Sequence, residues 1–103
     1  MSNVDRSKVL SSDDVEAELR DRGLAWQLED GALSKKARGR DFAAALDYVN
    51  RVGALAEQHN HHPDIAISWN TVTLRLVTHS AGGITGADLD MAARIDGLDP
   101  PAS

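Results

Sequence analysis

The chain contains no cysteine in its 103 residues. This absence excludes disulfide bonds, catalysis by a thiolate and zinc sites built on cysteine sulfur. The sequence also has no run near the roughly 20 consecutive apolar residues that a membrane-spanning helix needs. Its beginning is polar, without the apolar stretch of a signal peptide. We therefore expect a soluble, cytoplasmic protein that does not act at a membrane.

Positive charge is scarce, since 11 Lys and Arg stand against 16 Asp and Glu, for a net charge of −5. Phosphate binding needs clustered basic side chains, so nucleic acid is not expected as a direct ligand. The basic run Lys35, Lys36, Arg38 and Arg40 lacks interleaved aromatic residues and is typical of a solvated strand and turn. The length predicts a single domain over 1–103 with one modest core, and its active site fits a surface cleft or subunit boundary best.

Periodicity and turn signals predict seven elements in the order α-β-β-α-β-β-α. Ser11 is a suitable N-cap and Gly23 a natural stop for the first helix, while Asp30-Gly31 favours a hairpin turn. Period-two alternation later in the chain predicts a second hairpin, with its turn near 70–71. Strands that arrive in hairpin pairs imply an α+β fold, a four-stranded antiparallel sheet with helices packed on one face. The expected segments are a loose leader at 1–9, helices over about 12–22, 41–58 and from 85, and strands near 26–29, 32–38, 65–69 and 72–77.

The apolar surface of the 41–58 helix is wider than a single contact with the sheet requires. One stripe contains Phe42, Leu46 and Val49, and a second stripe beside it includes Tyr48. Packing on one sheet needs an apolar stripe of only about 100°. The extra face therefore predicts either contact with another subunit or cover by the first helix.

Histidines gather in the second half of the chain, at His59, His61, His62 and His79. Histidine is the side chain that can both donate and accept protons near neutral pH. Two or three such rings in one cleft could protonate a leaving hydroxyl while removing a proton elsewhere on the substrate. His79 ends a strand just before a glycine loop, a favoured place for functional residues.

Two other interpretations of the histidines stay open at this point. A histidine cluster after a helix can simply complement the negative end of the helix dipole. Zinc is the second alternative, because imidazole is a common zinc ligand. His61 and His62 are adjacent and cannot easily face one ion, whereas Glu57 and His61 could both ligate if the helix continues.

Three further side chains are candidates for supporting roles. Glu57 lies one helical turn before His61 and could orient it, or could be an ordinary exposed helix acid. Asp88 falls at the third position of the last helix, where acids cap the helix, yet it shares a face with apolar residues. Trp69 alternates with Ile65, which predicts core packing. Gly82-Gly83 is a weak signal for an anion-binding loop.

These motifs together resemble the signature of the pterin-4a-carbinolamine dehydratases over nearly the whole chain. The family pattern is an acid, three residues, His-His-Pro, an aromatic residue, a Thr-His pair and a later aspartate. The matching residues are Glu57, His61, His62, Pro63, Trp69, Thr78, His79 and Asp88. The resemblance implies the same four-stranded antiparallel sheet covered by helices, and a homodimer or homotetramer.

The resemblance also implies an enzyme, a 4a-hydroxytetrahydrobiopterin dehydratase of the hydro-lyase class. It would remove water from 4a-hydroxytetrahydropterin to give quinonoid dihydropterin, and so recycle the pterin of aromatic amino acid hydroxylases. His61 and His79 would be the acid–base pair and His62 would mainly hold the pterin, with no metal or organic cofactor. The implied substrate-binding residues are Asn60, His61, His62, Pro63, Val77, Thr78, His79 and Ser80, and the supporting residues are Glu57, Asp88 and Trp69.

Two features depart from the family pattern, and two other functions compete. The polar segment 35–38 replaces a more aromatic strand, and Asn60 stands where some members have aspartate. One alternative is a non-catalytic protein-interaction role, because some animal relatives are dimerisation cofactors of a homeodomain transcription factor. The other is a pterin-binding or assembly role outside hydroxylase recycling. Retention of all three histidines favours catalysis.

Overall fold

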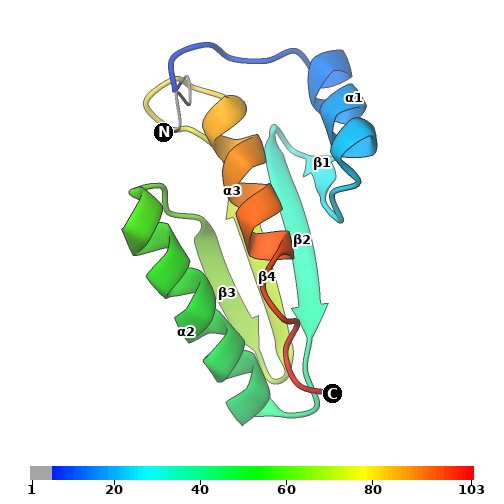
Figure 1. The fold of residues 1–103 in the computed structure, drawn as a ribbon, viewed down its shortest axis with the longest axis vertical. Coiled ribbons are helices and arrows are strands. Elements are labelled where there is room, and N and C mark those ends of the chain that lie inside the picture. Colours follow the sequence, from blue (N-terminus) through cyan, green and yellow to red (C-terminus); the bar gives the residue numbers. More distant parts are fainter. Residues whose placement is uncertain (1–5) are drawn as a thin grey trace.

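The computed structural model describes residues 6–103, and part of the expected leader at 1–9 lies outside them. Its elements follow the predicted order α-β-β-α-β-β-α (Figure 1). The helices are α1 (Ser12–Arg22), α2 (Phe42–His59) and α3 (Gly86–Asp96). The strands are β1 (Gln27–Glu29), β2 (Ala32–Arg38), β3 (Asp64–Ser68) and β4 (Thr71–Leu76). The predicted α+β fold class is confirmed.

Local signals account for where the first elements begin and end. The Ser11 side chain accepts a hydrogen bond from the Asp14 backbone N–H at 3.1 Å, which caps α1. Gly23 ends the helix at φ 63°, a left-handed conformation that glycine adopts without a Cβ penalty. Asp30 and Gly31 both have positive φ, 50° and 75°, as the tight turn between β1 and β2 requires.

The four strands form one antiparallel sheet in the order β1-β2-β4-β3. The segment 32–38 becomes the longest strand and lies inside the sheet despite its polar sequence. Its register pairs Leu33 with Leu76 and Lys35 with Leu74, so these residues share the face that the helices cover. Lys36 points to the opposite face, which no helix covers (Figure 1). A strand with one uncovered face tolerates polar residues there, which explains the weak apolar pattern.

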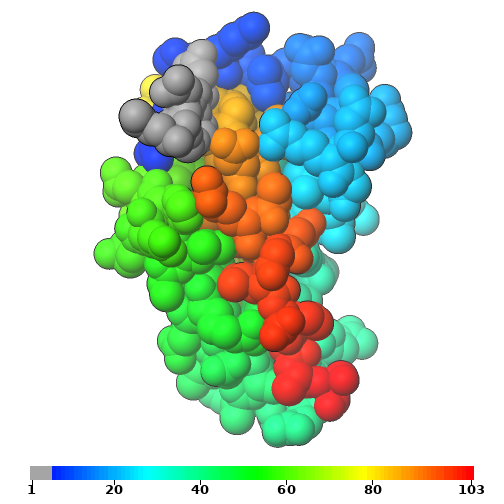
Figure 2. All heavy atoms as spheres, in the orientation of Figure 1, coloured from blue at the N-terminus to red at the C-terminus, as the bar shows by residue number. Residues whose placement is uncertain are grey.

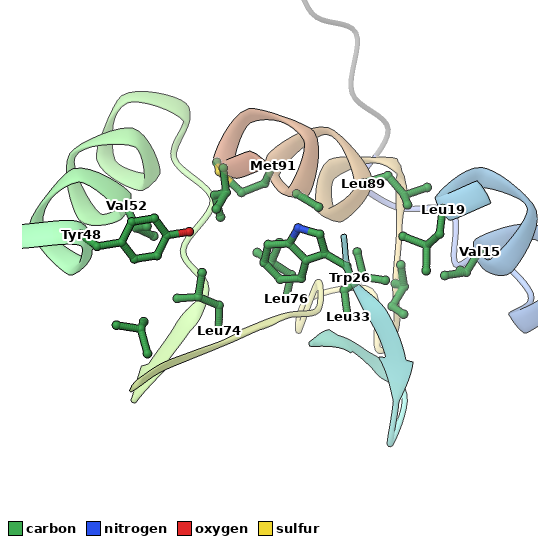
Figure 3. Close-up of a cluster of buried hydrophobic side chains, with 14 of the residues drawn as sticks. Val15, Leu19, Trp26, Leu33, Tyr48, Val52, Leu74, Leu76, Leu89 and Met91 are labelled. Carbon is green, nitrogen blue, oxygen red and sulfur yellow. The ribbon is translucent and has the colours of Figure 1, made fainter. Parts of the chain in front are cut away.

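The three helices lie side by side on the face of the molecule that Figure 2 shows. The core lies between the sheet and these helices (Figure 3). Val72, Leu74 and Leu76 project from β4 with no exposed surface. Leu89, Met91 and Tyr48 pack against them from the helices (Figure 3). Side chains from every helix thus share a single cluster, and the helices depend on the sheet for burial.

Asp96, the last residue of α3, joins three distant segments. Its side-chain oxygens accept hydrogen bonds at 2.9 Å from the Ala25 backbone N–H and from the Trp26 indole N–H. The same carboxylate accepts a hydrogen bond from the Lys35 ammonium of β2. Burial raises the pKa of Tyr48, and the negative charge of Asp96 raises it further. Asp96 therefore holds the start of β1 and the middle of β2 against α3.

Helix α2 buries residues from both of its apolar stripes but leaves part of its apolar surface outside. Ala45, Tyr48 and Val52 are buried, whereas Phe42 and Leu46 are 45% and 43% exposed. Helix α1 lies against β1 and α3, away from this surface (Figure 1). Cover by the first helix, one of the two expectations for the extra face, is therefore wrong. Within residues 6–103, no helix combines the length and apolarity that a membrane crossing requires.

Trp69 does not pack in the core, and this expectation is also wrong. It is 65% exposed and occupies the two-residue turn between β3 and β4, with φ 54°. Ser68 pairs with Thr71 across that turn, so the strand ends one residue before the tryptophan. The alternation of Ile65 and Ile67 is real, but it does not extend to position 69.

We expect Asp96→Ala to lower the free energy of unfolding by about 2–3 kcal/mol, because it leaves a buried indole N–H and a half-buried ammonium without their acceptor. Urea unfolding followed by far-UV circular dichroism measures this change. Glu16→Ala, which removes one exposed carboxylate from α1, is the matched control and should change stability by less than about 0.5 kcal/mol. Equal effects of the two substitutions would contradict the role of Asp96.

Candidate active site

Asp88 is completely buried at the third position of α3, where the sequence predicts a capping acid. Thr85 is the N-cap, and its backbone N–H donates to Asp88 Oδ2 at 2.9 Å. The Thr85 hydroxyl in turn accepts from the Ala87 backbone N–H at 3.2 Å. This capping box fixes the carboxylate relative to the helix, so its oxygens point in defined directions.

Two further groups donate to this carboxylate from other parts of the chain. The Thr78 hydroxyl donates to Oδ2 at 2.7 Å, and His61 Nε2 lies 2.6 Å from Oδ1. A carboxylate only accepts, so the hydrogen between His61 and Asp88 belongs to Nε2. In its neutral form the ring then carries its lone pair on Nδ1. No buried side-chain polar atom among residues 6–103 lacks a partner.

His61 reaches Asp88 because α2 ends abruptly. Asn60 adopts a left-handed conformation, φ 50°, which asparagine tolerates better than most residues. Its backbone N–H and that of His61 both donate to the Ala56 carbonyl. The chain therefore turns out of the helix at Asn60, and the His61 side chain, 11% exposed, is directed at α3 rather than along α2. We call residues 60–63 the first histidine loop.

His62, on the same loop, has a different partner. Its Nε2 contacts the Glu57 carboxylate of α2, and both side chains are exposed. The expectation that Glu57 orients His61 is therefore wrong: Glu57 orients His62, and Asp88 orients His61. Because α2 stops at His59, Glu57 and His61 are not related by a continuous helical turn, and no group of three or more potential metal ligands occurs among residues 6–103.

His79 lies in a tight turn after β4, which we call the second histidine loop (residues 78–83). Thr78 and Gly83 form an isolated bridge that closes this loop, and the Gly82 N–H donates to the Thr78 carbonyl at 3.0 Å. The His79 side chain is exposed, and its imidazole makes no hydrogen bond within the described part of the chain. Its neighbour Thr78 is buried on Asp88, so the second histidine loop and His61 meet at one carboxylate.

The other expected site residues lie around these two loops, with one exception. Pro63 is buried directly before β3, Val77 is half-buried, and Ser80 is exposed in the second histidine loop. Trp69 belongs to the turn at the far end of the β3–β4 hairpin, away from both loops (Figure 1). Trp69 and His61 therefore do not belong to one site within a single chain.

A cleft of about 310 Å³ opens beside His61, between the end of α2 and α3. Its lining residues are Arg6, Gln58, His59, His61, Ala87, Asp90, Met91 and Arg94. Of the site residues expected from the sequence, His61 alone is among them. Arg6 and Arg94 were not expected there, because one lies in the apparently loose leader and the other is an isolated helix cation.

A buried acid, an aligned histidine and a second histidine on a closed loop define a small α+β protein with a candidate acid–base site. The family model for pterin 4 alpha carbinolamine dehydratase matches residues 8–98. The chain belongs to this family, and the expected resemblance is confirmed.

Individual relatives agree with the family assignment. A protein of Mycolicibacterium vanbaalenii with the provisional name pterin-4-alpha-carbinolamine dehydratase is 48% identical over 90 residues, 87% of this chain and 96% of the relative. A Mycobacterium tuberculosis protein (strain ATCC 25177 / H37Ra) with the same provisional name is 47% identical and covers 87% and 95%.

Two solved structures have a similar fold. The transcriptional coactivator/pterin dehydratase from Brucella melitensis superposes with a TM-score of 0.79 at 29% identity, over 87% of this chain and 97% of that one. A pterin dehydratase-like RuBisCO assembly factor of the alpha-carboxysome gives 0.57 at 24% identity, over 72% and 86%. The second similarity concerns the fold alone.

We expect Asp88→Asn to reverse the tautomer of His61. The asparagine oxygen should stay with the two donors on Oδ2, from Thr78 and Thr85, which turns its NH₂ toward His61 Nε2. The neutral ring must then accept at Nε2 and carry its hydrogen on Nδ1. Long-range ¹H–¹⁵N spectra of the imidazole should show Nε2–H in the wild type and Nδ1–H in the variant.

The free energy of unfolding distinguishes a reversed His61 tautomer from a general loss of structure. Asp88→Asn should cost only about 1 kcal/mol, whereas Asp88→Ala should cost about 3 kcal/mol because buried donors lose their acceptor. An Nδ1–H tautomer in the wild-type protein would contradict the hydrogen-bond assignment.

Proposed function

We propose that this protein dehydrates 4a-hydroxytetrahydropterin to quinonoid dihydropterin by histidine acid–base catalysis. The observation that carries the proposal is the buried Asp88 carboxylate, which aligns His61 and anchors the neighbour of His79. An aligned imidazole with a free Nδ1 is suited to move protons. Membership of the dehydratase family supplies the substrate class.

The proposed step needs one acid and one base. The C4a–O bond breaks and the hydroxyl leaves as water after it receives a proton. The ring nitrogen next to C4a loses its proton to the base, and its electron pair forms the new C=N bond. No electron is gained or lost overall, so the step requires no redox partner. With histidines as the acid and the base, the proposed mechanism uses no metal or organic cofactor. His61 and His79 are the proposed acid–base pair.

The remaining residues of the two histidine loops would bind the pterin. His62 would hold the ring, with Glu57 restraining its imidazole. The pterin would lie against the first histidine loop and against residues 77–80. Because both loops meet at Asp88, a planar ring between them would contact groups with fixed relative positions. The product would return to the pterin cycle of aromatic amino acid hydroxylases.

The direct test is a stopped-flow assay of 4a-hydroxytetrahydropterin dehydration by protein that has been treated with a chelator. We expect catalysis under these conditions. No acceleration by protein that circular dichroism shows to be folded would overturn the proposal.

His61→Ala and His79→Ala should each slow dehydration by about 10²-fold or more, the usual contribution of a general acid or base. Both variants should remain folded, because His79 is exposed and the Asp88 carboxylate keeps its hydrogen bonds from Thr78 and Thr85 when the His61 ring is removed. The rates should be compared in samples with matched circular dichroism spectra. Wild-type rates in both variants would exclude the mechanism.

A non-catalytic interaction role is the second candidate function. The Brucella melitensis structure that this chain resembles is described as a transcriptional coactivator as well as a pterin dehydratase. The feature that favours an interaction role here is the apolar surface that the chain leaves exposed on α2, around Phe42 and Leu46. Folded protein without dehydratase activity would favour this candidate.

We further propose that a second copy of the chain covers this surface in a homodimer or homotetramer. Leu46→Glu should shift the solution mass toward that of the monomer, because it places a charge in an apolar contact. Light scattering after size-exclusion chromatography measures the mass. Ser12→Glu, which adds the same charge at an exposed position of α1, away from this surface, is the control and should leave the mass unchanged. A monomeric wild-type protein would contradict the proposal.

A further inference from the structure

Arg6 caps the end of α2 from outside the helix. Its guanidinium donates to the His59 carbonyl at 2.9 Å and to the Asn60 carbonyl at 2.7 Å. Carbonyls in the last turn of a helix have no partner within that helix, and they mark the negative end of its dipole. A cation that binds two of them holds the turn where the chain leaves α2. The next residue along the chain is His61.

The same N-terminal segment also contacts the second histidine loop. The Leu10 backbone N–H donates to the Ile84 carbonyl at 2.8 Å, directly after that loop. Val9 packs on Gly83, so closely that a Cβ at position 83 would lie 2.7 Å from Val9 Cγ1. Gly83 is the residue that closes the loop by pairing with Thr78. The position thus has no room for a side chain while Val9 is in place.

Residues 6–10 therefore contact the first histidine loop at Asn60, next to His61, and the end of the second at Gly83, which pairs with the neighbour of His79. Asp88 connects the same two loops from inside the protein, through His61 and Thr78. The segment also borders the cleft beside His61, since Arg6 lines it. Two connections, one buried and one at the surface, constrain a pair of loops far better than one, because a single connection leaves rotation about it free.

We propose that residues 6–10 form a strap that holds the two histidine loops in register, with Arg6 as its positioning residue. This proposal deepens the proposed dehydratase function and rests on it for its kinetic consequences. Arg6 precedes residues 8–98, the part of the chain that the family model matches. The strap therefore begins outside the part of the chain that the family model matches, and its last three residues lie at the start of that part. Its effect on catalysis comes from geometry, because a misplacement of about 1 Å can cost about 10²-fold in rate.

The first test follows the histidine rings and needs no activity. Arg6→Ala should shift the imidazole resonances of His79, although the guanidinium hydrogen bonds of Arg6 go to the end of α2. Gly83→Ala should shift those of His61, because the new Cβ displaces Val9 and the strap. Arg20→Ala removes an exposed arginine that has no side-chain partner within residues 6–103, and it should shift neither ring.

Two double variants show whether the strap, rather than Asp88, transmits these effects. In Gly83→Ala/Val9→Ala the steric conflict disappears, so the His61 resonances should return toward their wild-type positions. In Arg6→Ala/Gly83→Ala the strap is already released, so Gly83→Ala should add no further shift at His61. Persistence of the full Gly83→Ala shift at His61 in both double variants would assign the coupling to Asp88 and overturn the proposal.

Kinetics provide the second test. Arg6→Ala should lower kcat by about 10-fold and change KM by less than about 3-fold, because the groups that meet the substrate remain. Arg6→Lys, which keeps a cation near the carbonyls but cannot bind both as a planar fork, should recover most of the loss. The Arg6→Ala and Gly83→Ala losses should not multiply, since either change alone frees the loops.

The resonance test of the strap and the test of dehydratase activity can be decided separately. If the wild-type protein has no dehydratase activity, the proposed function is wrong, while the resonance shifts still decide whether the strap exists. Wild-type kcat in Arg6→Ala, measured in an active enzyme, would overturn the positioning role. Independent, multiplying losses in the double variant would also overturn it, because they indicate two separate local effects.

Discussion

The organisation of this protein depends on the burial of one carboxylate. A charged group without contact to water is tolerated only when hydrogen bonds replace its hydration. Asp88 obtains these bonds from the cap of α3, from the residue before His79 and from His61. Segments far apart in the chain must therefore converge before the acid can be buried. The same hydrogen bonds thus bury Asp88 in the core and align His61 at its edge.

Helix α3 carries a second acid, at its other end, that also collects hydrogen bonds from distant segments. It carries Asp88 in its first turn and ends with Asp96, eight residues later, which places the two acids about 12 Å apart along the helix axis. The first collects donors from the histidine loops and the second collects donors from Trp26 and Lys35. The helix thus connects the candidate site to the β1–β2 side of the sheet. It is fixed at both ends by charge-assisted hydrogen bonds and between them by apolar packing.

Much of the fold and part of the site could be predicted from local sequence. Caps, turn residues and periodicity predict the seven elements, because each depends on interactions within a few residues. Position 88 was correctly expected to face buried surface, since its capping role and its apolar neighbours are both local facts. The partner of Glu57 was not predictable, because it depends on the angle at which the chain leaves α2 at Asn60. The exposure of Trp69 depends on where the turn interrupts the alternation.

The sequence by itself determined the types of element, their order, the antiparallel sheet and the identity of the histidines. These properties follow from hydrogen bonding and apolar spacing over short stretches. Only the tertiary structure decided which acid serves which histidine, and that Arg6 caps the helix that precedes His61. The His61–Asp88 and Arg6–Asn60 pairings join residues that are 27 and 54 positions apart, and the Glu57–His62 contact, over five positions, depends on how the chain leaves α2. No local preference encodes them, because they arise when separately formed elements pack on a common sheet.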